Sequence, residues 1–292
     1  MINKKNILVT GANGQLGREL QDIAPSYTSY RFFFADKAEL PIEDTAVVNK
    51  YFSQQQFDIC INCAAFTAVD KAETEKEKAF LINGIAVGEL AAVCKQYNTR
   101  LIHISTDYVF DGTSTAPYKE SDPTCPVSSY GKSKLMGEQL ALQNDPSVII
   151  IRTSWLYAAY GNNFVKTMLR LMKEKETINV VNDQYGCPTY AADFAWAIME
   201  IIEKLAMDNE QPAIFNYCNS GITTWFEFAL AIKEISGSKC MINPIPTSQY
   251  PTAANRPQYS VLNTKKIRDT FQVSIPEWKD SLVKCLQRLT TD

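Results

Sequence analysis

A short β-rich stretch, Asn6–Thr10, runs directly into three evenly spaced glycines, Gly11, Gly14 and Gly17. A turn this tight needs glycine where φ is positive and where the backbone approaches a ligand closely. Helical hydrophobic spacing follows over residues 15–24, and the free N–H groups at such a helix N-terminus attract phosphate. An ordinary strand-to-helix turn is the alternative, but this context favours dinucleotide binding. The residues expected at its pyrophosphate are Gly11, Asn13, Gly14, Gln15, Leu16 and Gly17.

Short β-rich runs and longer helical runs alternate through the first half of the chain. The expected strands are 6–10, 31–35, 58–63, 100–105 and 148–152, and the expected helices are 15–24, 44–54, 76–97 and 128–143. Nearly continuous apolar strands are typical of a parallel sheet that is covered on both faces. Strand–helix alternation with right-handed crossovers then predicts an α/β fold, a Rossmann-type doubly wound parallel sheet.

After Trp155 the alternation of expected strands and helices becomes irregular. Prolines and glycines are interspersed there among expected helices at 164–173, 193–206 and 225–235. We expect residues 1–155 to form an NAD(P)-binding Rossmann domain. Residues 156–292 are expected to form mainly a smaller C-terminal substrate-binding lobe that closes over the carboxyl edge of the sheet. The chain of this lobe is expected to cross back to the first domain.

The composition excludes several classes of protein. Hydrophobic residues make up 46% and charged residues 21%, both near the globular average, so a sizeable core is available. The formal net charge of -3 argues against a nucleic-acid or membrane-surface partner, because such partners require a basic face. No apolar run approaches the roughly 18 residues needed to cross a bilayer. We therefore expect a cytoplasmic protein.

The charge at the end of the second expected strand bears on the choice of cofactor. Asp36 lies about 20 residues past the glycines, where an acid binds the adenosine ribose hydroxyls and disfavours a 2′-phosphate. Lys37 and Arg18 are instead able to accommodate that phosphate. The sequence leaves NADPH and NADH both open.

A second set of polar residues is expected near the same edge of the sheet. The fourth expected strand ends in Ser105, Thr106 and Asp107, and Tyr130 and Lys134 lie one helical turn apart at the start of a helix. A free tyrosine titrates near about 10, so proton transfer near neutrality requires a neighbouring positive charge. A pair with this spacing is expected about once by chance in this composition, so its position carries the argument.

These residues resemble the extended short-chain dehydrogenase/reductase family, which combines a glycine loop, a Ser or Thr after the fourth strand and a Tyr–Lys pair. The resemblance runs nearly to the C-terminus and includes TAVDKAE (67–73), STDYVFDG (105–112), RTSWLY (152–157), GNNFVKTMLRL (161–171), NDQYG (182–186), TTW (223–225), and YPT (250–252) followed by Arg256-Pro257. It implies a reductase that takes hydride from NADPH or NADH to the C4 ketone of a small-molecule nucleotide sugar.

The resemblance also implies a role for individual residues. Thr106 would hydrogen-bond the substrate carbonyl, Tyr130 would donate the proton, and Lys134 would lower the tyrosine pKa and hold the nicotinamide ribose. The residues implied along the cofactor after the third strand are Ala64, Ala65 and Thr67. Those implied near the sugar nucleotide are Asp107, Trp155, Trp225 and Arg256, of which Arg256 would bind the diphosphate. Trp155 and Trp225 as core aromatics, and Arg256 as a solvated loop cation, are the alternatives.

Some members of the family bind Mg²⁺ at a homodimer interface through glutamates. Glu19 matches one such position, but Ala192 stands at the other, so Mg²⁺ and a metal-bridged homodimer are not favoured and no metal ligand is predicted. Cys60 and Cys63 form a C-x-x-C without the further ligands that zinc requires. His103, within the fourth strand, is predicted to be a core residue.

Two other functions stay open at this point. The first is a nucleotide-sugar 4,6-dehydratase or 4-epimerase of the same fold. Dehydratases typically follow their Thr with Asp-Glu, whereas here Tyr108 follows Asp107. The second is a non-catalytic NADP-binding regulatory subunit resembling that of methionine adenosyltransferase. An intact set of Thr106, Tyr130 and Lys134 permits catalysis without proving it.

Overall fold

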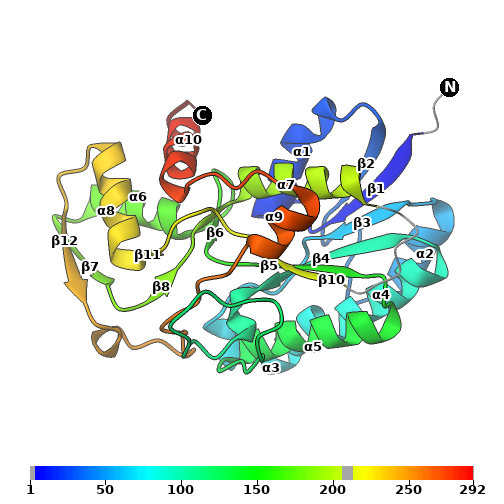
Figure 1. Cartoon of the computed structure of the whole chain (residues 1–292), viewed down its shortest axis with the longest axis horizontal. Helices are drawn as coiled ribbons and strands as arrows, with labels where there is room; N and C mark the ends of the chain where they lie inside the picture. Colours follow the sequence, from blue (N-terminus) through cyan, green and yellow to red (C-terminus); the bar gives the residue numbers. More distant parts are fainter. Residues whose placement is uncertain (1–3, 206–212, 292) are drawn as a thin grey trace.

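The computed structural model describes residues 4–205 and 213–291, and its centre is a parallel sheet of six strands (Figure 1). In spatial order the strands are β2 (Tyr30–Ala35), β1 (Lys5–Thr10), β3 (Ile59–Asn62), β4 (Arg100–Thr106), β5 (Ile149–Thr153) and β10 (Ala213–Asn216). The predicted Rossmann-type parallel sheet is confirmed. Within the described ranges, no helix has the length and apolar character needed to span a membrane.

The direction of chain winding reverses at β1. The chain passes from β1 to β2 on one side and then returns to β3 on the other side of β1. Connections that leave two neighbouring strands in opposite directions open a crevice at their carboxyl ends, where ligands bind in open α/β sheets. Thr10 is paired in register with Asn62, and Asn62 with His103, so these three side chains cross β1, β3 and β4 in one row.

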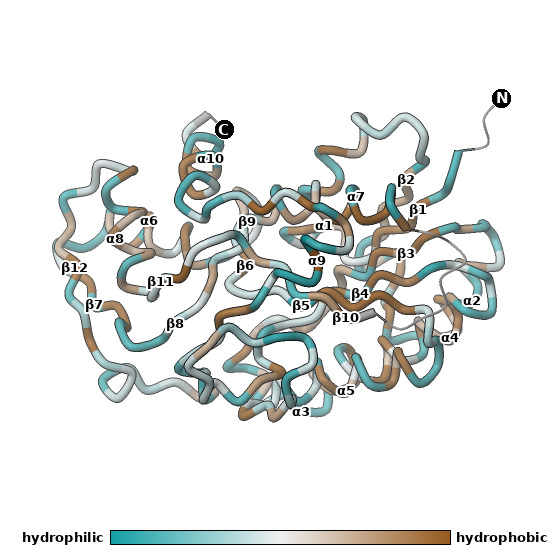
Figure 2. The backbone as a smooth tube through the Cα atoms, in the orientation of Figure 1, coloured by the Kyte–Doolittle hydropathy of each residue, from teal (hydrophilic) through white to brown (hydrophobic). Residues whose placement is uncertain are grey.

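Helices cover both faces of the sheet, which accounts for the continuous apolar strands. One face is covered by α1 (Gln15–Ile23), α7 (Ala191–Lys204) and α9 (Lys265–Phe271). The other is covered by α2 (Thr45–Gln54), α4 (Ala86–Gln96) and α5 (Ser129–Asn144). Figure 2 shows the hydrophobic colour concentrated on the inner strands, as expected for a sheet buried on both sides.

The helix expected over 76–97 is interrupted. It consists of α3 (Lys76–Phe80), a π-helical turn at Leu81–Ile85 and α4. Within the turn, the buried Asn83 amide accepts from the N–H of Phe66 at 2.8 Å and donates to its carbonyl at 2.9 Å. It also donates to the Ser133 hydroxyl at 3.0 Å. The π-turn thereby fixes the loop after β3 against α5, and such turns are frequent at functional sites.

A second lobe has its own core. Its helices are α6 (Phe164–Glu174), α8 (Trp225–Ser236) and α10 (Trp278–Thr291), and its strands are β7 (Thr177–Val181), β12 (Met241–Ile245), β6 (Leu156–Tyr157), β9 (Thr189–Tyr190), β8 (Tyr185–Gly186) and β11 (Thr223–Thr224). Side chains of the three helices and of β7 and β12 form one buried cluster, which includes Val165, Phe228, Ile232, Ile242, Leu282 and Leu286. Short helical turns lie at Ala24–Ser26, Lys71–Glu73, Asp107–Val109 and Thr247–Gln249.

The chain after residue 155 contributes to both lobes. Strand β10 extends the main sheet beside β5, and α7 packs against α1. Helix α7 begins two residues before the expected start at Asp193, and the expected end at Ala206 lies outside the described residues. The division of the chain at residue 155 remains a prediction.

Candidate active site

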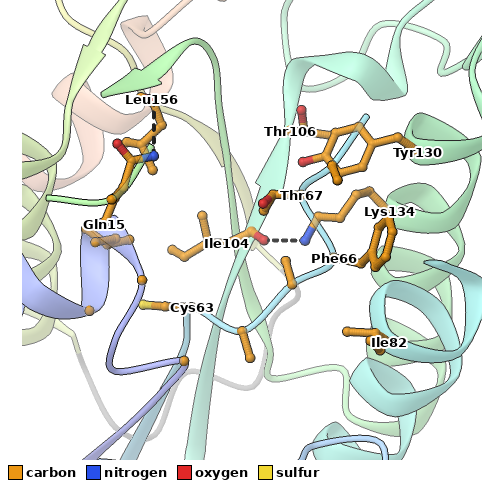
Figure 3. A pocket seen from close by; sticks show the side chains of 18 of the residues that line it. Gln15, Cys63, Phe66, Thr67, Ile82, Ile104, Thr106, Tyr130, Lys134 and Leu156 are labelled. Carbon is orange, nitrogen blue, oxygen red and sulfur yellow. Dashed lines mark hydrogen bonds between the residues drawn. The ribbon is translucent and has the colours of Figure 1, made fainter. Parts of the chain in front are cut away.

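A cavity of about 1300 Å³ lies at the carboxyl ends of the parallel strands. Its walls combine the glycine loop, the segments after β2, β3 and β4, the start of α5, and residues after β5 that lead into the second lobe. Of the predicted site residues, those that line it are Gly11, Asn13, Gly14, Gln15, Leu16, Gly17, Asp36, Ala64, Ala65, Thr67, Thr106, Asp107, Tyr130, Lys134, Trp155 and Trp225. The close-up in Figure 3 shows Thr106, Tyr130 and Lys134 on one side of this space and Gln15 on the other.

The glycine loop fits a pyrophosphate. Gly11 has φ +63°, and a Cβ there would lie 2.6 Å from the amide nitrogen of Ala64. A Cβ on Gly17 would lie 2.6 Å from the carbonyl oxygen of Gly11. Gly14 precedes α1 and supplies no side-chain cap, so the first N–H groups of the helix are open to an anion.

Asp36 lies at the far end of this loop. Its Oδ2 accepts from the Asn13 amide at 2.6 Å, and its Oδ1 accepts from the backbone of Ala38 at 2.8 Å. The two cations that the sequence offers for a 2′-phosphate both have partners, because Lys37 pairs with Glu43 at 2.9 Å and Arg18 stacks on an aromatic ring. Both cations are thus engaged by other side chains, and the role of Asp36 toward the adenosine ribose remains a prediction.

Thr106 and Tyr130 lie together at the end of β4 and the start of α5 (Figure 3). Helix α5 is capped by Ser128, whose hydroxyl accepts from the N–H of Gly131 at 3.1 Å, and this fixes the turn that carries the phenol. Burial raises the pKa of Tyr130 to about 12, although a hydrogen bond with Thr106 opposes the shift. The phenol therefore carries its proton in the ligand-free protein.

Lys134 lies one turn further along α5 and is buried. Its Nζ donates to the carbonyl oxygen of Ile104 at 2.7 Å and lies 3.3 Å from Nε2 of His103. Burial lowers the pKa of Lys134 to about 8, against the opposing effects of Glu138 and Cys63. The predicted Tyr–Lys pair is brought to one cavity wall, and the pKa of the lysine is lowered to about 8, so its charged form still predominates at neutral pH.

Asp107 is buried next to Thr106, whose hydroxyl donates to Oδ1 at 2.9 Å. Burial raises the pKa of Asp107 to about 6, although hydrogen bonds with Ser260 and Thr106 lower it. A polar group that is kept buried at a cavity wall is suited to binding a hydroxyl-rich ligand.

Trp155 and Trp225 stack face to face, with ring centroids 3.5 Å apart and planes 8° from parallel. Trp155 follows β5 and has φ +46°, an uncommon conformation outside glycine. A Cβ on Gly186 would lie 2.4 Å from the Trp155 ring, so glycine is required there. Both rings line the cavity and also border the core of the second lobe, and their role in binding the substrate remains a prediction.

Arg256 does not line this cavity, unlike the other predicted substrate residues. Its two terminal nitrogens donate to the carboxylate of Asp70, at 3.2 and 2.6 Å. Arg256 is therefore a partly exposed loop cation with a defined partner, Asp70. A role in binding a diphosphate remains a prediction.

The metal site suggested by Glu19 does not fit these residues. Glu19 is 1% exposed, and its carboxylate accepts from Arg288 at 2.6 Å, so a cation already lies beside it. Asp193, the nearest acid to Ala192 in sequence, accepts from Asn219 at 2.8 Å. In the described part of the chain, no group of three or more His, Cys, Asp or Glu could hold a metal ion.

The sequence reasoning missed several residues of the cavity wall. Phe66 and Ile82 form an apolar side of the cavity in Figure 3; Ile82 lies in the π-turn, and Asn83 of the same turn holds the backbone of Phe66. Gly161 and Asn162 also line the cavity. The adjacent Asn163 donates to Gln15 Oε1 at 2.9 Å and ties this loop to the glycine loop. The GNNF run at 161–164, already noted as a motif, was the signal that pointed to this loop.

Comparison with known proteins places this geometry among related chains. The family model described as RmlD substrate binding domain matches residues 5–291. The chain is 42% identical over 281 residues to the spore coat polysaccharide biosynthesis protein SpsK of Bacillus subtilis, covering 96% of each protein. It is 39% identical over 283 residues to a dTDP-4-dehydrorhamnose reductase of Aggregatibacter actinomycetemcomitans, covering 94% of this chain and 96% of the relative.

A solved structure agrees with these matches. The dTDP-4-dehydrorhamnose reductase of Bacillus anthracis, in complex with NADP, superposes on this chain with a TM-score of 0.92 at 37% identity. The match covers 98% of this chain and 100% of the other.

Proposed function

The chain belongs to the dTDP-4-dehydrorhamnose reductase family, and on that premise we propose that it reduces the C4 ketone of dTDP-4-dehydro-L-rhamnose to dTDP-L-rhamnose with NADPH or NADH. The observation that carries this proposal is the position of Thr106, Tyr130 and Lys134 in one cavity with the glycine loop. A proton donor and a dinucleotide cradle that face the same space are what a ketone reduction requires.

The roles of the catalytic residues follow from their protonation and contacts. When bound, the nicotinamide supplies the hydride. We assign the Thr106 hydroxyl, which donates to Asp107 in the ligand-free protein, to the substrate carbonyl beside the Tyr130 phenol, whose high pKa keeps its proton available for the developing alkoxide. We assign to Lys134, one turn further along α5, the stabilisation of the resulting tyrosinate by its positive charge.

We assign to the sugar nucleotide the part of the cavity wall that Asp107, Trp155 and Trp225 form. Asp107 offers a hydrogen-bonding group next to Thr106, and the stacked Trp155 and Trp225 offer an apolar surface at the second lobe. We assign the cofactor to the loop residues and to Asp36, Ala64, Ala65 and Thr67, which lie on the Rossmann side.

The environment of Tyr108 disfavours a dehydratase. Its ring packs edge-on against Tyr130, with centroids 5.6 Å apart. Burial raises the pKa of Tyr108, so the residue that stands in the place of the dehydratase glutamate is not a base at neutral pH. Elimination from the sugar would lack its proton acceptor.

A direct assay tests the proposal. The protein is mixed with NADPH and the 4-keto sugar nucleotide, and the absorbance of the reduced nicotinamide is followed. We expect stoichiometric oxidation of NADPH and a product two hydrogens heavier by mass spectrometry. A dehydratase or epimerase would show no net consumption of NADPH, and a regulatory subunit would bind NADPH without turnover. Either result would overturn the assignment.

Two features of its setting are also proposed, from the sequence alone. We propose a cytoplasmic location, which fractionation of the cells tests. A homodimer is the second, and light scattering of the purified protein tests it; repeating the measurement after treatment with a chelator tests whether a metal contributes.

A further inference from the structure

A row of buried polar side chains connects the glycine loop to the catalytic lysine. The Thr10 hydroxyl donates to Asn62 Oδ1 at 2.6 Å, and Asn62 Nδ2 lies 3.1 Å from Nδ1 of His103. On the other edge of the imidazole, Nε2 lies 3.3 Å from Lys134 Nζ. Thr10, Asn62 and His103 are each 0% exposed, so no solvent mediates these contacts.

A backbone amide fixes the orientation of the Asn62 side chain. The N–H of Ala64 lies 3.2 Å from Asn62 Oδ1, and a backbone N–H can only donate. If the amide were flipped, Nδ2 would meet that N–H as a second donor and both would be left unsatisfied in a buried site. Oδ1 therefore faces Ala64, and Nδ2 faces His103.

The orientation of Asn62 fixes the tautomer of His103 in turn. Nδ1 receives a hydrogen bond from the amide, so it carries no proton, and the single proton of the neutral ring lies on Nε2. Burial and Lys134 both lower the pKa of His103 well below its usual range, so the ring is neutral. The Nε2–H bond then points toward Lys134 Nζ, which can accept it only as an uncharged amine.

We propose that His103 is a positioning residue for the proton transfer of this enzyme: locked as the Nε2–H tautomer by Asn62, it stabilises the uncharged amine form of Lys134. The proposal deepens the proposed function and rests on it for its kinetic consequences. Its geometric part, the tautomer, stands independently of any substrate.

The consequence for the reaction is a balanced transfer of one proton. The Tyr130 O–H bond breaks as the substrate O4–H bond forms, which leaves a tyrosinate. In this proposal, the proton that restores the Tyr130 O–H bond comes from Lys134 Nζ, one turn further along α5, and the resulting amine accepts from His103 Nε2–H. Solvent returns a proton to the amine before the next turnover.

Other groups around Lys134 act in the opposite direction. Glu138, one turn along α5, and Cys63, after β3, both favour the charged ammonium. Glu138 is itself occupied, since it accepts from Arg152 Nη2 at 2.6 Å and from the Ser105 hydroxyl at 2.5 Å. Tyr130 favours the ammonium only after it has lost its proton. Among these neighbours, His103 is the one that presents a donor to Nζ.

The first experiment uses the fact that His103 is the chain's one histidine. Long-range ¹H–¹⁵N spectra of the tag-free, ¹⁵N-labelled protein report which ring nitrogen carries the proton. We expect a neutral Nε2–H ring whose signals stay constant across neutral pH. An Nδ1–H ring or an imidazolium in the wild-type protein would refute the proposal, whatever its activity.

The second experiment exchanges the donor and the acceptor in the hydrogen bond between residue 62 and His103 Nδ1. In Asn62→Asp the carboxylate can only accept, so we expect the Nδ1–H tautomer and a lone pair on Nε2 that faces Lys134. His103→Phe removes the donor without adding charge. In both variants the fall of kcat at high pH, which follows loss of the Lys134 proton, should move upward by about one pH unit.

Controls separate this proposal from a general effect on folding or function. Thr10→Val leaves the Ala64 amide in place, so its tautomer and pH profile should match the wild type. Thermal melting and NADPH affinity identify variants that fail to fold, and the wild-type spectrum decides the tautomer without them. If folded variants show an unshifted profile, the kinetic role of His103 is refuted; if the wild type does not oxidise NADPH, the proposed function fails instead.

Discussion

Arg256 and Asp70 form a two-pronged ion pair, with nitrogen–oxygen distances of 3.2 and 2.6 Å, between a loop of the C-terminal half and the segment after β3. Asp70 Oδ1 also accepts the backbone N–H of Ala254 at 3.1 Å. The carboxylate thus holds both the side chain and the backbone of this loop. Hydrogen bonds with Arg256 lower the pKa of Asp70, so the pair is charged at neutral pH.

Arg256→Ala should raise the KM for the nucleotide sugar and leave the KM for NADPH unchanged. A lost charge-assisted hydrogen bond is worth roughly 1.5–3 kcal/mol, and contacts remote from C4 act on KM more than on kcat. Steady-state kinetics with each substrate varied separately measures this. Asp70→Asn is the matched control: if Arg256 binds the diphosphate, this variant keeps a near-normal KM, whereas an equal rise would assign Arg256 to holding the loop alone.

Tyr130→Phe should keep cofactor binding and lose most turnover, because only the phenolic proton is removed. General acid catalysis contributes typically ~10²–10⁴-fold, so kcat should fall by that factor. Fluorescence titration with NADPH and single-turnover kinetics measure the two effects. A variant within about twofold of the parent would remove Tyr130 from the proton transfer.

The preference between NADPH and NADH should be loose. Asp36 favours a free ribose hydroxyl, while Lys37, which lines the cavity although it pairs with Glu43, offers a positive charge to a phosphate, and Arg18 is the second cation that the sequence offers. We expect kcat/KM values within about thirtyfold, or roughly 2 kcal/mol of differential binding. Asp36→Ala should move the ratio toward NADPH. A ratio of about a thousand between the two kcat/KM values in the parent would contradict the view that Asp36 and the two cations both lie near the ribose.

The pair of Glu138 and Arg152 should be costly to break. Both side chains are 2% exposed, and their Oε2 and Nη2 atoms are 2.6 Å apart. Glu138→Gln leaves a buried guanidinium without its counter-ion, which costs about 3–5 kcal/mol in comparable cases. Glu174→Gln, in the exposed pair with Arg170, should cost less than about 1 kcal/mol. Urea unfolding of the two variants compares them directly, and equal losses would contradict the burial argument.

Asp107 should destabilise the fold in a pH-dependent way. Its folded pKa is raised to about 6 from 3.8, so the protonated form is favoured in the folded state and ionisation has a cost. That cost is absent below the unfolded pKa, grows as the pH rises between the two values, and is complete above the folded pKa. Asp107→Asn should therefore gain up to about 3 kcal/mol above pH 6 and nothing near pH 4. Chemical denaturation of the ligand-free proteins at both pH values tests the sign.

The sheet could be predicted from the sequence wherever a strand is buried on both faces. The five expected strands are present, and four of them, β1, β3, β4 and β5, are largely buried, as continuous apolar runs between turns predict for a covered parallel sheet. Strand β10 was not predicted, because its four residues lie outside the regular alternation of strands and helices in the first half of the chain. They form a strand by pairing with β5, more than 60 positions earlier in the sequence. The π-turn at Leu81–Ile85 was missed for a related reason, since the contacts of Asn83 cause it and helical spacing does not show them.

In the candidate site too, the residues set by local sequence pattern could be predicted, and those set by contacts between distant segments could not. Residues at the carboxyl ends of strands could be predicted, since a parallel sheet brings those ends to one edge. Thr106 lies at this edge for that reason, whereas Tyr130 reaches it from the start of α5. The partner of Arg256 could not be predicted, because Asp70 is 186 positions away and no periodic pattern links them.

Strand β10 also has a consequence for how the protein is made. On the ribosome, β5 emerges well before β10, so until residue 216 has been synthesised the backbone groups along one side of β5 have no strand to bond with. An open strand edge is a template for pairing with other chains. During synthesis, the N-terminal half therefore has β5 as an unpaired edge strand that is able to pair with other chains. Pairing with β10 of the same chain removes this edge.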